Sequence, residues 1–110
     1  MTLSNGLYVA NFGTPLGGGA GVVTLSDGKL TGGDSMMSYV GTYTQDADQF
    51  SAQLVADKHT DVPGMESVFG SDHVNISITG HSGSDEAALT GASPQAPGIT
   101  LQAHLRKIAS

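Results

Sequence analysis

The feature that most constrains this chain is a period of two in its hydrophobic residues, which recurs from one end to the other. Val74, Ile76 and Ile78 alternate with polar side chains along the segment 73–81. Successive side chains of a strand point to opposite faces of a sheet, so this pattern buries one face and leaves the other in water. Similar strand patterns are found over residues 6–13, 19–25, 39–44, 49–59, 87–92 and 99–107. They predict an all-β protein.

Turn-forming residues separate these runs. Ser26, Asp27 and Gly28 connect 19–25 to a short strand at 29–32, and an Asp-Gly pair readily adopts the positive φ of a tight hairpin. Residues 44–48 and 82–86 are read as further turns. The chain therefore contains about eight short antiparallel strands. No sustained helical period is present, and at most one short helix is expected, over 61–70, where Asp61 could cap and Pro63 could open a turn.

Glycine distinguishes the two ways in which such strands can bury their apolar faces, a barrel or a two-sheet sandwich. Many glycines fall at strand ends or inside strands, where barrel closure requires coiling and close backbone approach. A small up-and-down barrel is therefore favoured. Gly32 and Gly33 are predicted to allow a corner, and Asp34 to hydrogen-bond the turning backbone. Gly41 is predicted to relieve crowding between the tyrosines on either side of it, two residues away.

Composition narrows the class of protein. A chain of 110 residues forms one domain, and a formal net charge of −6 disfavours direct binding to nucleic acid. The absence of cysteine fits a reducing interior. The N-terminus does not resemble a secretion signal, and no apolar run approaches the roughly 20 residues that span a bilayer. A soluble, cytoplasmic protein without membrane association is expected.

Motifs for catalysis or cofactors are weak. The glycine-rich segment 16–21 lacks the Lys and Ser/Thr of a phosphate loop, and 80–84 lacks the second glycine of a nucleophile elbow. His73 and His81 share a strand face but lie about 26 Å apart at ~3.3 Å per residue, so one metal cannot join them. We expect no metal, no cofactor and no catalytic residue. The pair Asp46 and Asp48 invites a glycosidase interpretation, but an exposed turn provides neither a cleft nor a desolvated acid.

The N-terminal half resembles the GrlR family, the negative regulators of bacterial type III secretion genes. The resemblance covers roughly residues 5–59. It is carried by Gly6-Leu7-Tyr8, Phe12, Gly19-Ala20-Gly21-Val22, Asp27-Gly28, Gly32-Gly33-Asp34, Tyr39 and Gly41.

This resemblance implies a lipocalin-like barrel that forms homodimers and acts by docking on a partner transcription activator rather than on DNA. The acidic surface run of the family falls here on Gln45, Asp46, Ala47 and Asp48, of which two are acidic. It thus implies a non-enzymatic negative regulator whose residues 45–48 contact a protein with a basic surface. A homodimer would also cover the unpaired edge strands of an open barrel.

Two alternatives remain open. The barrel could carry a small apolar, lipid-like ligand, because eight-stranded barrels can hold one. The residues expected to face such a ligand are aromatic, although a core role is the more usual one for these side chains: Tyr8, Phe12, Tyr39 and Tyr43. A hydrolase that uses Asp46 and Asp48 ranks far behind.

Overall fold

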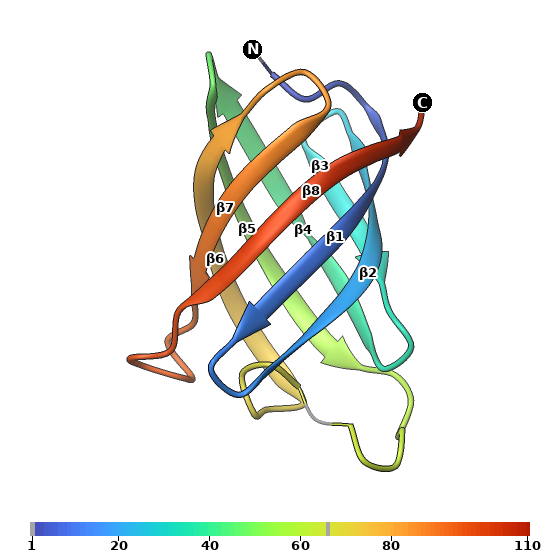
Figure 1. Ribbon diagram of the computed structural model, residues 1–110, viewed down its shortest axis with the longest axis vertical. Helices are drawn as coiled ribbons and strands as arrows, with labels where there is room; N and C mark the ends of the chain where they lie inside the picture. The colour runs from blue at the N-terminus through green and yellow to red at the C-terminus, as the bar shows by residue number, and fades with distance from the viewer. Residues whose placement is uncertain (1, 66) are drawn as a thin grey trace.

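Eight antiparallel strands follow one another around a closed barrel in the computed structural model, which describes residues 2–65 and 67–110 (Figure 1). Each strand pairs with the next along the chain, and β8 returns to pair with β1. The predicted all-β, up-and-down barrel is confirmed. The strands are β1 (Gly6–Thr14), β2 (Gly17–Ser26), β3 (Lys29–Gly33), β4 (Met37–Asp46), β5 (Gln49–Lys58), β6 (His73–Ser82), β7 (Glu86–Ala92) and β8 (Leu101–Ala109).

The sheet closes on itself, so the barrel differs from the open one whose edge strands a second copy was expected to cover. β1 pairs with β8 from Leu7 opposite Ala109 to Gly13 opposite Gln102, so every described strand has a neighbour on both sides. The expectation of open edges that a second copy would cover was therefore wrong. Local stretches stay unpaired on one side, such as residues 17–21 of β2, because β2 pairs with β3 from Val22 to Ser26.

Several inward-facing glycines allow neighbouring strands to approach closely. A Cβ on Gly32 would lie 2.0 Å from the carbonyl oxygen of Val22, and one on Gly41 would lie 2.1 Å from that of Gln53. Both distances are far inside van der Waals contact, so no other residue fits without a shift of the backbone. Gly41 therefore relieves crowding against β5. The sequence had placed this crowding between Tyr39 and Tyr43 instead.

Two hairpin turns have left-handed residues. Asp27 and Gly28 have φ of 49° and 86°, the pattern of the tight turn that the sequence predicted. The second turn is shorter than the predicted 44–48, because β4 continues to Asp46 and β5 begins at Gln49. Ala47 there has a φ of 55°, which is unfavourable for a residue with a Cβ.

Replacing Ala47 with glycine is expected to stabilise the protein by about 0.5 to 1 kcal/mol, because glycine adopts positive φ without a steric cost. Urea unfolding measures the difference. Ala20→Gly, at an exposed position of β2, is the matched control and should instead destabilise by a similar amount. Equal losses for the two variants would contradict this assignment of the turn.

The short helix predicted over 61–70 is absent from the described residues, and residue 66 lies outside them. The segment forms turns, in which Met65 N–H donates to the carbonyl of Val62 at 3.0 Å and Gly70 N–H donates to that of Ser67 at 2.8 Å. No helix in the described residues could cross a membrane.

The barrel interior is filled unevenly. At the end that carries both termini in Figure 1, Tyr8, Tyr43 and Phe50 are buried, and Leu3 of the N-terminal segment belongs to the same buried cluster. The opposite end carries the β1–β2, β3–β4, β5–β6 and β7–β8 connections. We call these the closed end and the loop end. The candidate site lies toward the loop end.

Candidate ligand cavity in the barrel

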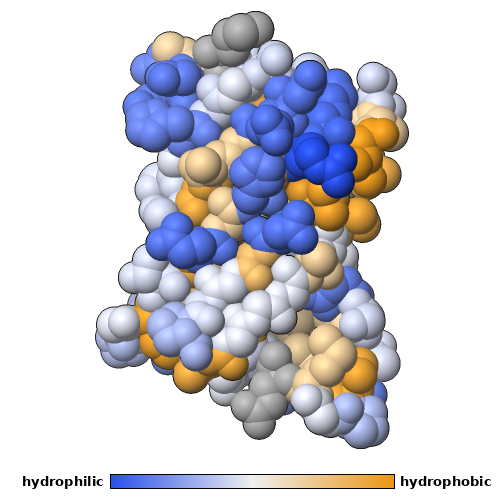
Figure 2. All heavy atoms as spheres, in the orientation of Figure 1, coloured by the Kyte–Doolittle hydropathy of each residue, from blue (hydrophilic) through white to orange (hydrophobic). Residues whose placement is uncertain are grey.

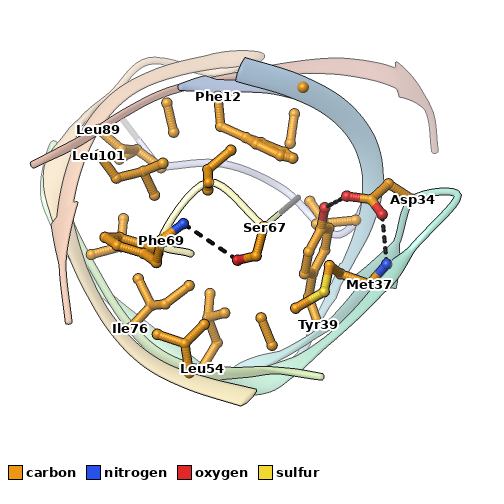
Figure 3. A pocket seen from close by; sticks show the side chains of 18 of the residues that line it. Phe12, Asp34, Met37, Tyr39, Leu54, Ser67, Phe69, Ile76, Leu89 and Leu101 are labelled. Carbon is orange, nitrogen blue, oxygen red and sulfur yellow. Dashed lines mark hydrogen bonds between the residues drawn. The ribbon is translucent and has the colours of Figure 1, made fainter. Parts of the chain in front are cut away.

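A cavity of about 120 Å³ lies inside the barrel (Figure 3). Most of the side chains around it are aliphatic or aromatic, and they come from every strand of the barrel and from the β5–β6 loop. Figure 3 shows strand residues such as Phe12, Leu54 and Leu89 pointing inward from around the ring, with Phe69 entering from the loop. Those that define its shape include Phe12, Leu54, Phe69, Ile76, Leu89 and Leu101.

The space arises because small residues occupy inward positions at this level. Ala10 on β1, Ala56 on β5 and Ala103 on β8 all line the cavity, as does Gly19 on β2. Eight-stranded barrels are just wide enough for side chains to fill, so a group of alanine and glycine leaves a void. Toward the closed end, the bulky side chains of Tyr8 and Tyr43 are buried inside the barrel.

The β5–β6 loop, residues 59–72, covers the loop end of the cavity. Its Phe69 is buried and lines the cavity together with Val68, Ser67 and Met65. The hydroxyl of Thr14 donates to the carbonyl of Val68, which joins the loop to the β1–β2 turn. His59 N–H donates to the carbonyl of Met36 at 2.8 Å, which joins the loop to the β3–β4 connection.

A carboxylate stands at one side of the cavity. Asp34 Oδ1 accepts the backbone N–H groups of Met36 and Met37 at 2.8 and 2.7 Å, and its Oδ2 accepts the hydroxyl of Tyr39. This confirms that Asp34 hydrogen-bonds the turning backbone after Gly33. Burial, with a further effect from Asp34, raises the pKa of Tyr39 well above its ordinary value, so the phenol stays protonated and donates.

Gly21 provides the room for this pair. A Cβ there would lie 3.2 Å from the Tyr39 hydroxyl and 2.7 Å from the carbonyl oxygen of Gly33. Tyr39 also packs edge-on against Phe12, with ring centroids 6.0 Å apart. The other polar group at the cavity is Ser67, whose hydroxyl oxygen accepts the N–H of Phe69 at 3.3 Å (Figure 3).

The four aromatic residues predicted to face a ligand lie in two places. Phe12 and Tyr39 line the cavity. Tyr8 and Tyr43 are core residues at the closed end, where the Tyr8 hydroxyl donates to the Ser4 carbonyl at 2.6 Å. Tyr43 stacks on Phe50 with ring centroids 5.5 Å apart.

The predicted partner-binding residues lie at the closed end, away from the loop that covers the cavity. Asp46, Ala47 and Asp48 are exposed, as expected, and Asp48 lies 3.8 Å from His81. Gln45 has a different role: its side-chain amide accepts from Leu3 N–H at 2.8 Å and donates to the Leu3 carbonyl at 3.0 Å. It therefore fixes the N-terminal segment over the closed end.

The remaining histidines pair with carboxylates on the outer surface. His73 contacts Asp57, and His104 lies 3.4 Å from Glu86. Among the described residues, no group of three or more His, Asp or Glu could hold a metal ion.

Sequence reasoning missed the β5–β6 loop as part of the site. A signal was present, because Val62, Val68 and Phe69 place three apolar side chains in a segment interrupted by Pro63 and Gly64. We assigned that pattern to a helix, whereas the loop uses it to cover an apolar interior. No protein-family model and no curated protein matches this sequence.

Proposed function

We propose that this protein is a non-enzymatic binding protein that holds a small apolar ligand inside the barrel. The observation that carries the proposal is the apolar cavity of about 120 Å³ beneath the β5–β6 loop. An engineered apolar cavity of about 150 Å³ stays dry and takes up benzene. The cavity therefore suits a ligand of about that size rather than a long-chain lipid.

The polar groups around the cavity support binding rather than catalysis. The carboxylate of Asp34 accepts from two backbone N–H groups and a phenol, and Ser67 accepts from the backbone. A nucleophilic serine needs a base within hydrogen-bond reach, whereas the contact of the Ser67 hydroxyl in the described residues is with the N–H of Phe69. Asp46 and Asp48 are exposed on a turn at the closed end, which argues against a hydrolase built on them.

Toluene is expected to bind and to raise the melting temperature, because the cavity is only partly enclosed and its open side leaves room for the methyl group. Ala103→Leu should abolish this shift because the added atoms fill the cavity. Ala88→Leu makes the same change at an exposed position of β7 and should leave the shift intact. Native mass spectrometry of the freshly purified protein provides a second measurement, in which a retained small molecule is expected. The proposal fails if toluene gives no shift, or if Ala103→Leu and Ala88→Leu behave alike.

A second candidate function, docking on another protein, is favoured by the exposure of Asp46 and Asp48 and by the resemblance to the GrlR family. In this candidate the protein is a cytoplasmic negative regulator that contacts a transcription regulator with a basic surface. Charges at the rim of an interface act mostly on association rate and are weakened by salt. The role of Gln45 in this contact would be indirect, because its side chain holds Leu3.

Changing both Asp46 and Asp48 to alanine is expected to reduce recovery of the partner from native cell extract at low salt, with less difference at high salt. The matched control removes two acidic charges near the loop end, at Asp61 and Asp72, which pair with Lys58. If both double variants recover the same partners with the same salt dependence, residues 46–48 are only a turn.

We further propose a homodimer formed through the outer face of β1 to β4. Strands β1, β2 and β3 contain no acidic residue although the protein has 10 of them, so two copies can meet here with little repulsion. Val22 and Val40 are 43% and 59% exposed on this face. Figure 2 shows hydrophobic side chains gathered at the right-hand edge of the upper half.

Sedimentation at micromolar concentration is expected to show a dimer that Val40→Lys converts to a monomer. Thr90→Lys, on the outer face of β7, is the matched control and should leave the dimer intact. A wild-type protein that is monomeric at every concentration refutes the dimer.

A further inference from the structure

The charges around the cavity restrict which polar group a ligand can carry. Asp34 is the one acidic side chain among the described lining residues, and none of those residues is Lys, Arg or His. A carboxylate or phosphate on the ligand would enter an apolar space beside a like charge with no cation to compensate it. Moving an unpaired anion out of water is strongly unfavourable.

The carboxylate of Asp34 retains capacity to accept. A carboxylate offers about four lone-pair positions, and two backbone N–H groups and the Tyr39 hydroxyl occupy three of them. No ion pair within 4.0 Å involves Asp34 in the described part of the chain, and His59 contacts its backbone carbonyl rather than its side chain. One acceptor position and one uncompensated negative charge therefore remain at the side of the cavity.

Aromatic rings stand beside this charge. Phe12 and Tyr39 line the cavity, and their rings meet edge to face with centroids 6.0 Å apart. A cation within about 6 Å of an aromatic ring is attracted to its face. The net charge of −6 on the whole protein also favours the approach of cations over anions.

We propose that the ligand is a small apolar amine, bound with its protonated amino group at Asp34 and its apolar body in the cavity. This inference rests on the proposed ligand-binding function. The ammonium donates to the carboxylate of Asp34, a residue that is partly exposed, so part of the hydration is retained on that side. The hydrocarbon body occupies the space between Leu54, Ile76 and Leu89.

A second charged site on the protein could in principle bind an anionic ligand, but its charge is already paired. A second hollow near the β5–β6 loop contains Lys58, but this ammonium already pairs with Asp61 at 2.5 Å and with Asp72 at 3.2 Å. An anionic ligand would have to displace both carboxylates.

Four probes of similar shape test the inference on the wild-type protein by calorimetry near neutral pH: benzylamine, benzyl alcohol, benzoate and toluene. Benzylamine is expected to bind about tenfold more tightly than benzyl alcohol, because both can donate to Asp34 but only the ammonium also pairs its own charge with the carboxylate. Benzoate is expected to bind most weakly. High salt should weaken the binding of benzylamine alone.

Asp34→Asn removes the charge and keeps one acceptor oxygen for the backbone. It should lower the affinity for benzylamine about tenfold while changing that for toluene by less than about threefold. The double variant Asp46→Asn and Asp48→Asn controls for binding to the acidic surface and should leave benzylamine affinity unchanged. If Asp34→Asn does not fold, the ranking of the probes on the wild-type protein decides.

The outcomes separate the inference from the function on which it rests. Equal affinity for benzylamine and benzyl alcohol, or tighter binding of benzoate, overturns the choice of an amine and leaves the cavity function standing. If neither toluene nor benzylamine binds, the proposed function itself fails. Loss of benzylamine binding in the Asp46 and Asp48 double variant would show that the amine binds the surface.

Discussion

Replacing Gly41 with alanine is expected to destabilise the barrel by about 3 kcal/mol or more, the upper end of what overpacking costs. The added Cβ would lie 2.1 Å from the carbonyl oxygen of Gln53 and 2.6 Å from the Cα of Leu54. These are backbone atoms of β5, so no rotation of a side chain relieves the contact. β4 and β5 would have to separate at the centre of their pairing, where Gly41 lies opposite Leu54.

Equilibrium unfolding in urea measures the effect, and Gly13→Ala is its matched control. A Cβ on Gly13 would meet its nearest atoms, in Gly17 and Gly18, at 3.5 and 3.6 Å, which is ordinary contact. That variant should be close to neutral. If the free energy of unfolding falls by less than about 1 kcal/mol in both variants, the barrel does not depend on the close approach of β4 and β5 at Gly41.

Replacing Asp34 with alanine is expected to destabilise the protein by about 3 kcal/mol, because three donors lose their acceptor at once and each orphaned donor costs roughly 1 to 3 kcal/mol when buried. These donors are the N–H groups of Met36 and Met37 and the hydroxyl of Tyr39. The partial exposure of Asp34 lets water satisfy some of them, which keeps the total well below the sum.

The matched control is Asp85→Ala, at an exposed residue whose side chain makes no hydrogen bond within the described residues. Its stability should change by less than about 0.5 kcal/mol. Urea unfolding measures the stability of each variant. Comparing tyrosine fluorescence with and without Tyr39→Phe reports whether the environment of the Tyr39 hydroxyl has changed. Similar decreases in the free energy of unfolding for Asp34→Ala and Asp85→Ala would show that the hydrogen bonds of Asp34 do not stabilise the fold.

The sequence predicted the strands well because their inward and outward sides differ in chemistry. Val74, Ile76 and Ile78 of β6 are all buried, as the alternation requires. The tight turn at Asp27 and Gly28 was also predictable, since few residue pairs favour two successive positive φ values. These features depend on neighbours in sequence or on the period of a strand.

Features that depend on distant contacts were not predictable in the same way. Gly41 must be glycine because the backbone of β5 lies against it. Gln45 accepts a hydrogen bond from the N–H of Leu3, which is 42 residues away in the sequence. The cavity is a further case. It arises from small residues on separate strands, such as Ala10, Ala56 and Ala103, which line one space only once the strands are paired in register.

The candidate site was therefore predicted only in part. Asp34 was expected as a turn residue, and Phe12 and Tyr39 as aromatic residues that face a ligand. Only the folded barrel brings these three side chains to one side of a cavity. Tyr8 and Tyr43 share the same alternation along their strands but lie nearer the closed end, which periodicity alone does not distinguish.

The nuclear Overhauser effect between bound toluene and the methyl groups of the protein reports where the ligand lies. We expect contacts from toluene to the inward methyls of Leu54, Ile76 and Leu89, and none to the outward methyls of Val22 and Val40. These contacts should disappear in Ala103→Leu and persist in Ala88→Leu. Contacts confined to the outward valines, or none at all with toluene in excess, would contradict a ligand site inside the barrel.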